Sequence, residues 1–319
     1  MNQRSNPGQL ASLVLATLFG CVVLTGCGVR DGKDADSTGD DRLYVVATTT
    51  MVADAAARIG GEHIRLNPLM KPGVDPHLYE PTPKDGIALR EADLVLYNGH
   101  FLEGQMEKAL QALGKKSYAV AEAIPERELL QDVESSHADP HVWGDVELWI
   151  QSLEVVGEAL ATTDKDNAEV YRIRTQEAVA ELKELDVWVK GRISEIPEAQ
   201  RILITSHDAF GYFGEAYGLQ VLGLQGISTV GEVGLAERVA MVDFIKDKGV
   251  KAIFVESSVN PAVIESVSQD AGVRIGGELF SDALGQGGQM EEMNGESYDV
   301  GTYIGMIKHN VNAVVEALK

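Results

Sequence analysis

From residue 43 onward, short apolar runs alternate along the chain with longer segments whose apolar residues have helical spacing. The short runs predict strands at 43–47, 63–70, 94–97, 118–121, 201–205, 220–224, 251–255 and 273–280. The longer segments predict helices at 51–59, 84–92, 102–113, 145–161, 209–217, 235–248, 261–271 and 298–318. A βα series of this kind folds as an open parallel sheet with helices on both faces.

One segment has a longer and more regular pattern than the rest. Residues three or four positions apart form one mostly apolar stripe, at Tyr171, Thr175, Ala178, Leu182, Leu185, Val189, Ile193 and Ile196. This stripe predicts a helix of about thirty residues, on the order of 45 Å long, which ends near Pro197. A coiled-coil arm would give the same pattern. Because a second βα series follows directly, we expect instead a single helix packed along two lobes.

The pattern as a whole predicts an α/β protein with two βα lobes and parallel sheets, joined by a single long backbone helix. We assign the N-terminal lobe to residues 42–163, the linking helix to 164–196 and the C-terminal lobe to 197–319. Ligands of open α/β sheets bind in the crevice at the carboxyl ends of the strands. We therefore expect a binding site in the cleft between the lobes.

The first 26 residues predict a secretory signal. They contain one early cation, Arg4, then an apolar run from Leu10 to Leu24 that is too short to span a bilayer comfortably, then small residues. Residues 24–27 read Leu-Thr-Gly-Cys, which resembles the lipobox of bacterial lipoproteins and implies cleavage before Cys27 and lipidation of its thiol. An ordinary cleaved signal is the alternative. Residues 27–41 are polar and charged and predict a flexible tether.

Composition limits both the partners of the protein and the way it is stabilised. The chain has 319 residues, of which 45% are hydrophobic, so it can bury a sizeable core. Its formal net charge of −22 disfavours nucleic acid as a partner and favours cations without selecting one of them. One of the two cysteines lies in the signal segment, so the mature chain cannot form an internal disulfide.

Four side chains are candidate metal ligands because of their places in the predicted fold. His77 lies in a loop whose four prolines restrict the backbone, and the same Asp-Pro-His triplet recurs at His141, before the last helix of the first lobe. His207 follows the strand predicted to end at residue 205, and Asp282 follows the one predicted to end at residue 280. Residues at strand exits meet in the crevice of such a sheet.

Three imidazoles and one carboxylate are a ligand set that suits Zn(II), Mn(II) or Fe(II), and poorly suits Ca(II) or Mg(II). Because neutral imidazole is the ligand form, binding should weaken as the pH falls through about 6.5. Tyr79, Asp139 and Asp208 are candidates for hydrogen bonds to imidazole, and Glu256 is either such a partner or a polar residue of the cleft. We interpret the remaining histidines as structural or solvated: His63, His100, His137 and His309.

Seven separated motifs, taken in order, resemble those of one protein family. They are DPHLYEPTP, EADLVLYNG, DPHVW, HDAFGYF, GLQGIST, FVESSVNP and IGGELFSDALG. Together they resemble the TroA-type zinc/manganese-binding lipoproteins of bacterial ABC importers, over residues 43–319. The resemblance implies two βα lobes joined by one long helix, with a metal held between the lobes by His77, His141, His207 and Asp282.

The function implied by this resemblance is capture of one divalent metal outside the membrane and delivery to an ABC permease and its ATPase. The segment 126–137 is short, and this favours Mn²⁺ as the cargo, because zinc-dedicated relatives often carry a long His-rich loop there. The three imidazoles, in contrast, favour Zn²⁺. Fe²⁺ is also compatible with this ligand set. We expect a lipid-anchored monomer that is not an enzyme. A metal-dependent hydrolase or adhesin is the alternative, but four ligands would close the site, and HExxH and GxSxG motifs are missing.

Release of the metal is expected to involve the loops that carry its ligands. A helix packed along both lobes should resist a wide hinge opening, so a local movement is favoured. The glycines at 285, 287 and 288 favour movement around Asp282.

Overall fold

The structure, a computed structural model, describes residues 40–131 and 137–319, and residues 41–319 form one compact unit. The predicted signal segment, Cys27 and most of the predicted tether lie outside the described residues. Within the described part of the chain, no helix is both long enough and apolar enough to cross a bilayer.

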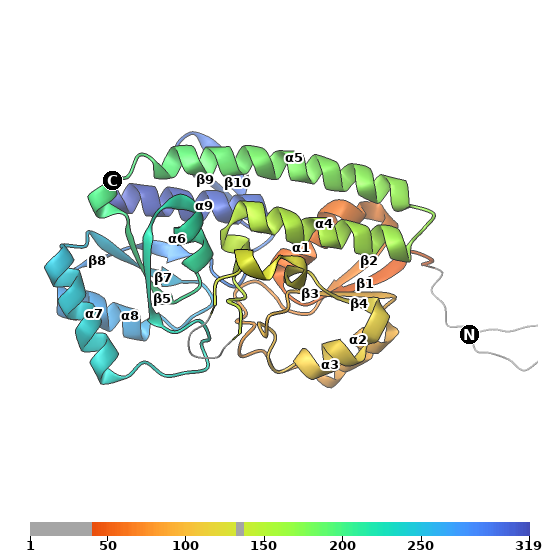
Figure 1. Ribbon diagram of the computed structural model, residues 1–319, viewed down its shortest axis with the longest axis horizontal. Coiled ribbons are helices and arrows are strands. Elements are labelled where there is room, and N and C mark those ends of the chain that lie inside the picture. The colour runs from red at the N-terminus through yellow and green to blue at the C-terminus, as the bar shows by residue number, and fades with distance from the viewer. Residues whose placement is uncertain (1–39, 132–136) are drawn as a thin grey trace, which may run out of the picture. The chain divides into compact units, whose positions relative to one another are not determined.

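Four parallel strands form a first sheet with helices on both of its faces, and we call this part the N-terminal lobe (Figure 1). In the order β2-β1-β3-β4, the sheet contains β1 (Leu43–Ala47), β2 (Ile64–Pro68), β3 (Leu94–Tyr97) and β4 (Ser117–Ala119). The helices are α1 (Thr50–Gly60), α2 (Pro83–Glu91), α3 (Glu107–Ala112) and α4 (Val146–Thr163). Strands β1 and β3 are almost entirely buried, which explains why their sequences are continuous apolar runs.

Helix α3 begins at Glu107, although the apolar spacing predicted a start at residue 102. Residues 99–101 have φ values of 91°, 52° and 63°, so the backbone turns through the left-handed region before the helix can start. The buried carboxylate of Glu103 accepts hydrogen bonds from the N–H groups of Asn98 and Gly99. These bonds hold the turn in place of the first turns of the predicted helix.

Two pairs of parallel strands form the second half of the fold, which we call the C-terminal lobe. Strand β5 (Ile202–His207) pairs with β6 (Gln220–Gln225), and β7 (Ala252–Glu256) pairs with β8 (Arg274–Leu279). The helices of this lobe are α6 (Gly211–Tyr217), α7 (Leu235–Lys248) and α8 (Ala262–Ala271).

Short 3-10 helices connect the longer elements along the chain. They are η1 (Gly61–His63), η2 (Gly114–Lys116), η3 (Ala121–Ala123), η4 (Glu126–Glu128), η5 (Val142–Gly144) and η6 (Glu198–Gln200).

The closing helix α9 (Tyr303–Leu318) starts later than the residue 298 that the sequence predicted. The residues before it form an antiparallel hairpin of β9 (Met290–Met293) and β10 (Glu296–Asp299). Asn294 and Gly295, with φ values of 53° and 79°, make the two-residue turn. Asn-Gly is the strongest short-range hairpin signal in a sequence, so this hairpin was predictable.

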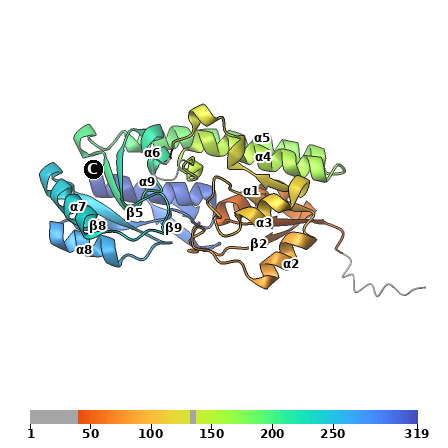
Figure 2. The same ribbon diagram turned by 60° about the horizontal axis from the view of Figure 1, so that its bottom comes forward.

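Helix α5 (Ala168–Ile193) is the predicted long helix, with 26 residues. It runs alongside α4 and α9 in both views of the ribbon (Figures 1 and 2). Its buried residues Tyr171, Leu182 and Val189 belong to one hydrophobic core that includes residues of both lobes. The prediction of an α/β fold with parallel sheets and one helix packed along both lobes is confirmed. The lobe boundaries at residues 163 and 197 stay a prediction.

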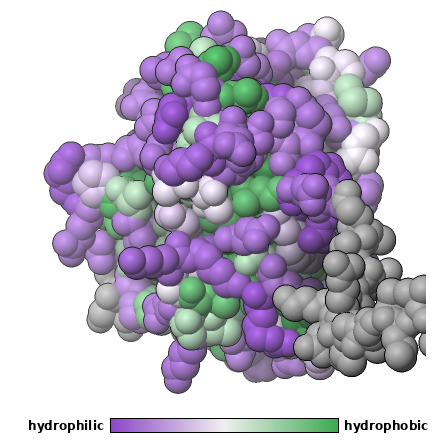
Figure 3. Space-filling view, turned by 90° about the vertical axis from the view of Figure 1, so that its right-hand side faces the viewer, coloured by the Kyte–Doolittle hydropathy of each residue, from purple (hydrophilic) through white to green (hydrophobic). Residues whose placement is uncertain are grey.

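The face of the molecule shown in Figure 3 is covered mainly by hydrophilic residues, with hydrophobic ones in small separate groups. This agrees with a charged fraction of 24% in the sequence. The large apolar side chains are concentrated instead in the shared core.

Candidate metal centre

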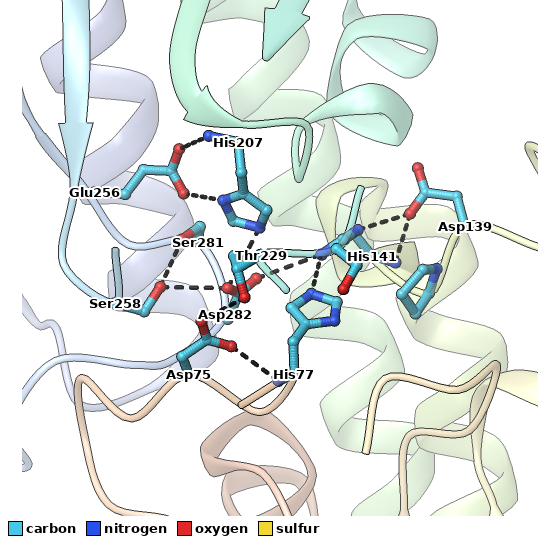
Figure 4. A network of polar contacts seen from close by, with 12 residues as sticks. Asp75, His77, Asp139, His141, His207, Thr229, Glu256, Ser258, Ser281 and Asp282 are labelled. Carbon is cyan, nitrogen blue, oxygen red and sulfur yellow. Dashed lines mark hydrogen bonds and ion pairs between the residues drawn. The ribbon is translucent and has the colours of Figure 1, made fainter. Parts of the chain in front are cut away.

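The four candidate ligands of the sequence analysis lie together where the two lobes meet (Figure 4). His77 comes from the loop between β2 and α2, and His141 lies directly before η5. His207 is the last residue of β5, which extends two residues further than predicted. Asp282 follows β8 in the chain. Each lobe therefore contributes two of the four side chains.

The separations of the donor atoms fit a small cation. One ligand atom from each of the four residues lies within 4.8 Å of all the others. Nε2 of His141 is 3.2 Å from Nε2 of His77 and 3.4 Å from Oδ1 of Asp282, while Nε2 of His207 is 3.3 Å from Oδ2 of Asp282. Ligands about 2.0–2.1 Å from a tetrahedral metal lie roughly 3.3 Å apart, so these three distances are close to those of a metal site.

Burial of these polar atoms costs free energy unless each atom has a hydrogen-bond partner or a bound ion. His77 is 6% exposed, His141 and His207 are fully buried, and Asp282 is 1% exposed. Within the described residues, Nε2 of His207 and Oδ1 of Asp282 are buried and have no hydrogen-bond partner. A buried polar atom without a partner costs about 1–3 kcal/mol, and a metal ion between them would remove that cost.

Both Asp-Pro-His triplets fold as the same local turn. The carboxylate of Asp75 accepts a 2.8 Å hydrogen bond from the N–H of His77, and Asp139 accepts one of 2.9 Å from the N–H of His141. An aspartate that binds the N–H two residues later forms an Asx turn, and the proline between them is already restricted in φ. The repeated triplet therefore presents a histidine from a rigid turn.

Two carboxylates behind the site orient its imidazoles. Oδ1 of Asp139 lies 2.7 Å from Nδ1 of His141, and Oε2 of Glu256 lies 2.5 Å from Nδ1 of His207. Glu256 also accepts a 2.8 Å bond from the N–H of His207. With Nδ1 directed at a carboxylate, Nε2 is the ring nitrogen that faces the other candidate ligands and could bind a metal. Of the two interpretations of Glu256, the structure supports the hydrogen-bond partner.

The segment of Asp282 is anchored by two side chains that are distant from it in the sequence. The side-chain amide of Asn310 donates a 2.7 Å hydrogen bond to the carbonyl of Phe280 and accepts a 2.9 Å hydrogen bond from the N–H of Phe280. Nε1 of Trp143 donates to the carbonyl of Ser281 at 2.9 Å. No local sequence pattern marks these partners, because they are 30 and 138 residues away along the chain.

The electrostatics of the cluster favour positive charge at its centre. Burial lowers the pKa of His77 to about 3. Burial opposes the charge on His141 as well, but the carboxylates of Asp139 and Asp282 outweigh it and raise the pKa to about 9. Burial also opposes charge on Asp282, yet the adjacent His207 and His141 hold its pKa well below the usual range. A divalent cation would supply the same positive charge in place of protons.

The other histidines lie apart from this cluster. Nε2 of His63 is 3.3 Å from Glu62, and Nε2 of His100 is 3.1 Å from the carbonyl of Ala121. His137 is exposed and stacks on Phe101, with 4.0 Å between ring centres. His309 contacts Glu291 and the carbonyl of Glu278. Tyr79, a candidate partner of imidazole, donates instead to Asp85 at 2.9 Å.

The sequence is similar to those of known metal-binding proteins. Residues 45–317 match the family described as "Zinc-uptake complex component A periplasmic". The chain is 44% identical to the manganese-binding lipoprotein MntA of Bacillus subtilis over 314 residues, which cover 96% of this chain and 99% of MntA. It is 40% identical to the zinc-binding protein TroA of Treponema pallidum over 312 residues, which cover 96% of this chain and 98% of TroA.

The fold is similar to that of a solved structure as well. The structure of the periplasmic zinc-binding protein TroA from Treponema pallidum superposes with a TM-score of 0.82 at 39% sequence identity. The match covers 87% of this chain and 99% of that one. The two-lobed arrangement is therefore shared with a protein that is named for binding zinc.

Proposed function

Because this chain belongs to the family of periplasmic zinc-uptake component A proteins, we propose that it captures a divalent transition metal and delivers it to an ABC permease with its ATPase. The resemblance inferred from the seven motifs is thereby confirmed. One observation carries the proposal. Three imidazoles and one carboxylate converge within 4.8 Å in a buried site, where two of the ligand atoms have no hydrogen-bond partner among the described residues.

The ligands in this proposal are His77, His141, His207 and Asp282. Nitrogen and carboxylate donors in this ratio suit Mn²⁺, Zn²⁺ or Fe²⁺. MntA is named for binding manganese and TroA for binding zinc, so both ions are candidates for the cargo. We propose manganese as the physiological cargo, and we expect zinc to bind at least as tightly because it lies above manganese in the Irving–Williams order.

The protein acts outside the cytoplasmic membrane in this proposal. The chain begins with a signal-like segment, and relatives such as MntA are named lipoproteins. We propose that Cys27 is lipidated, that the polar tether links it to the folded part, and that the protein is a monomer. The anchor would keep the metal-binding part close to the permease.

Transport is favoured over catalysis by the closed ligand set. A catalytic zinc site keeps three protein ligands and an open position for water, whereas four protein ligands fill a tetrahedral site. The relatives are named as metal-binding proteins, not as hydrolases or adhesins. We therefore propose that the protein binds and releases its cargo without chemical change.

The test is the metal content of the full-length protein, purified in detergent without chelating resin, by inductively coupled plasma mass spectrometry. About one Mn or Zn per chain is expected. His207→Ala should lower the affinity at least about a hundredfold, because it removes one ligand and leaves Glu256 unpaired. His137→Ala, which changes an exposed histidine, is the matched control. A wild-type protein that contains no metal and takes up none on titration would contradict the proposal.

A further inference from the structure

The two Asp-Pro-His turns use their aspartates differently. Oδ1 of Asp139 contacts both the backbone N–H and the imidazole Nδ1 of His141, so both contacts are to the histidine of the same turn. Asp75 binds the N–H of His77 with Oδ1, but its second oxygen accepts a 2.6 Å hydrogen bond from the hydroxyl of Thr229. Since Thr229 belongs to the C-terminal lobe, this bond crosses between the lobes directly beside a candidate ligand (Figure 4).

Thr229 is held in a fixed position relative to the ligands of its own lobe. It lies in the turn after β6, and its carbonyl accepts a 2.7 Å hydrogen bond from Nε2 of Gln225, the last residue of that strand. Gln225 is paired in register with His207 on β5. A continuous chain of contacts therefore joins the strand of His207 to the loop of His77.

Two other bonds between the lobes are deeply buried. Nε1 of Trp143 binds the carbonyl of Ser281, and the hydroxyl of Tyr303 donates 2.8 Å to the carbonyl of Trp143. Trp143 and Tyr303 are each 2% exposed and belong to the shared core. By contrast, the loop of Asp75 is partly open to solvent, with residues 71–73 and Leu78 exposed. Breaking the Asp75 contact does not require the core to open.

We propose that the hydrogen bond between Asp75 and Thr229 closes the metal site on the side of His77 and sets the rate at which metal leaves. Both are positioning residues, since they act through His77 and not on the metal. The inference rests on the proposed function. It differs from the expected movement around Asp282, which stays a prediction: residues 281–285 are buried, whereas Gly287 and Gly288, which also favoured that movement, are exposed.

The test uses metal-loaded full-length protein in detergent and follows release of Zn²⁺ or Mn²⁺ to excess EDTA by stopped flow. Thr229→Val keeps the shape of the side chain but removes the donor to a carboxylate. Release should become about tenfold faster or more, as expected for loss of a hydrogen bond to a charged group. Thr229→Ser restores the hydroxyl and should release within about twofold of wild type. Ser228→Ala removes the neighbouring exposed hydroxyl, which accepts a 3.4 Å hydrogen bond from the N–H of Val230, and is the matched control.

Hydrogen exchange separates local opening from misfolding. In Thr229→Val, exchange should accelerate at residues 71–79 and 226–231 and stay unchanged in the strands of both lobes. If the valine variant unfolds, Thr229→Ala replaces it, because alanine adds no new methyl group. Release at the wild-type rate from either folded variant would overturn the inference. A wild-type protein that binds no metal would instead overturn the proposed function, so the two failures differ.

Discussion

Buried carboxylates fix the orientation of two of the candidate imidazole ligands. Glu256 is 2% exposed and contacts both the backbone and the ring of His207. It thereby fixes the ring orientation and selects the tautomer whose Nε2 can bind a metal. Without this partner the His207 side chain would be less ordered, and ordering it when the metal binds would cost conformational entropy.

We expect Glu256→Gln to lower the affinity for Mn²⁺ and Zn²⁺ about ten- to a hundredfold, the usual effect of changing such a partner. The reason is that glutamine offers one acceptor oxygen where His207 presents two N–H groups. Competition titration against a metal indicator measures the change. Glu265→Gln, on the exposed face of α8, is the control and should bind like wild type. Equal affinities of the two variants would show that Glu256 does not support the ligand.

The roles of some single residues could be predicted from the sequence, and those of others could not. The two Asp-Pro-His triplets could be read as rigid turns, because the Asx turn and the proline act within three residues. Thr229 could not be connected to Asp75, because 154 residues separate them and nothing near either one indicates the contact.

Helix α5 is the element that both lobes share. Its inward stripe packs into a single core, whereas its outer positions face solvent: Leu182 is 2% exposed and Val187 is 69% exposed. Its hydrophobic period was clear in the sequence because a helix of 26 residues repeats its pattern many times. Short elements gave weaker periodic signals, as the late start of α3 shows, whereas the hairpin before α9 is marked by its Asn-Gly turn and not by a period.

We expect Leu182→Ala to lower the free energy of unfolding by about 2–5 kcal/mol, because it leaves a cavity in the shared core. Val187→Ala on the same helix should change it by no more than about 0.5 kcal/mol. Urea denaturation followed by circular dichroism compares the two variants. A similar loss in both would mean that helix propensity, and not packing, determines the contribution of α5.

Binding at the junction of the lobes should stabilise the molecule as a whole. The four candidate ligands come from both lobes, so a metal can be bound only while the lobes are folded and in contact. A ligand that binds only the native state adds RT ln(1 + [L]/Kd) to the free energy of unfolding.

Zn²⁺ or Mn²⁺ at a thousandfold excess over its Kd should therefore add about 4 kcal/mol and raise Tm by on the order of 10 °C. Differential scanning calorimetry of the metal-stripped and loaded protein measures the shift. Mg²⁺ at the same concentration should give almost none, because it prefers oxygen ligands. An equal shift with Mg²⁺ would indicate general screening of the negative charge and not binding to the histidines.

The α/β class, the long helix and the four candidate ligands could be predicted from the sequence alone. These depend on repeated hydrophobic periods, on rigid local turns and on the rule that strand exits converge, all of which act over short stretches of chain. The folded arrangement was needed to see that Glu256 orients His207, that Asn310 holds the segment of Asp282, and that Thr229 donates a hydrogen bond to Asp75. Those contacts join residues that become neighbours only when the chain folds, so no local pattern encodes them.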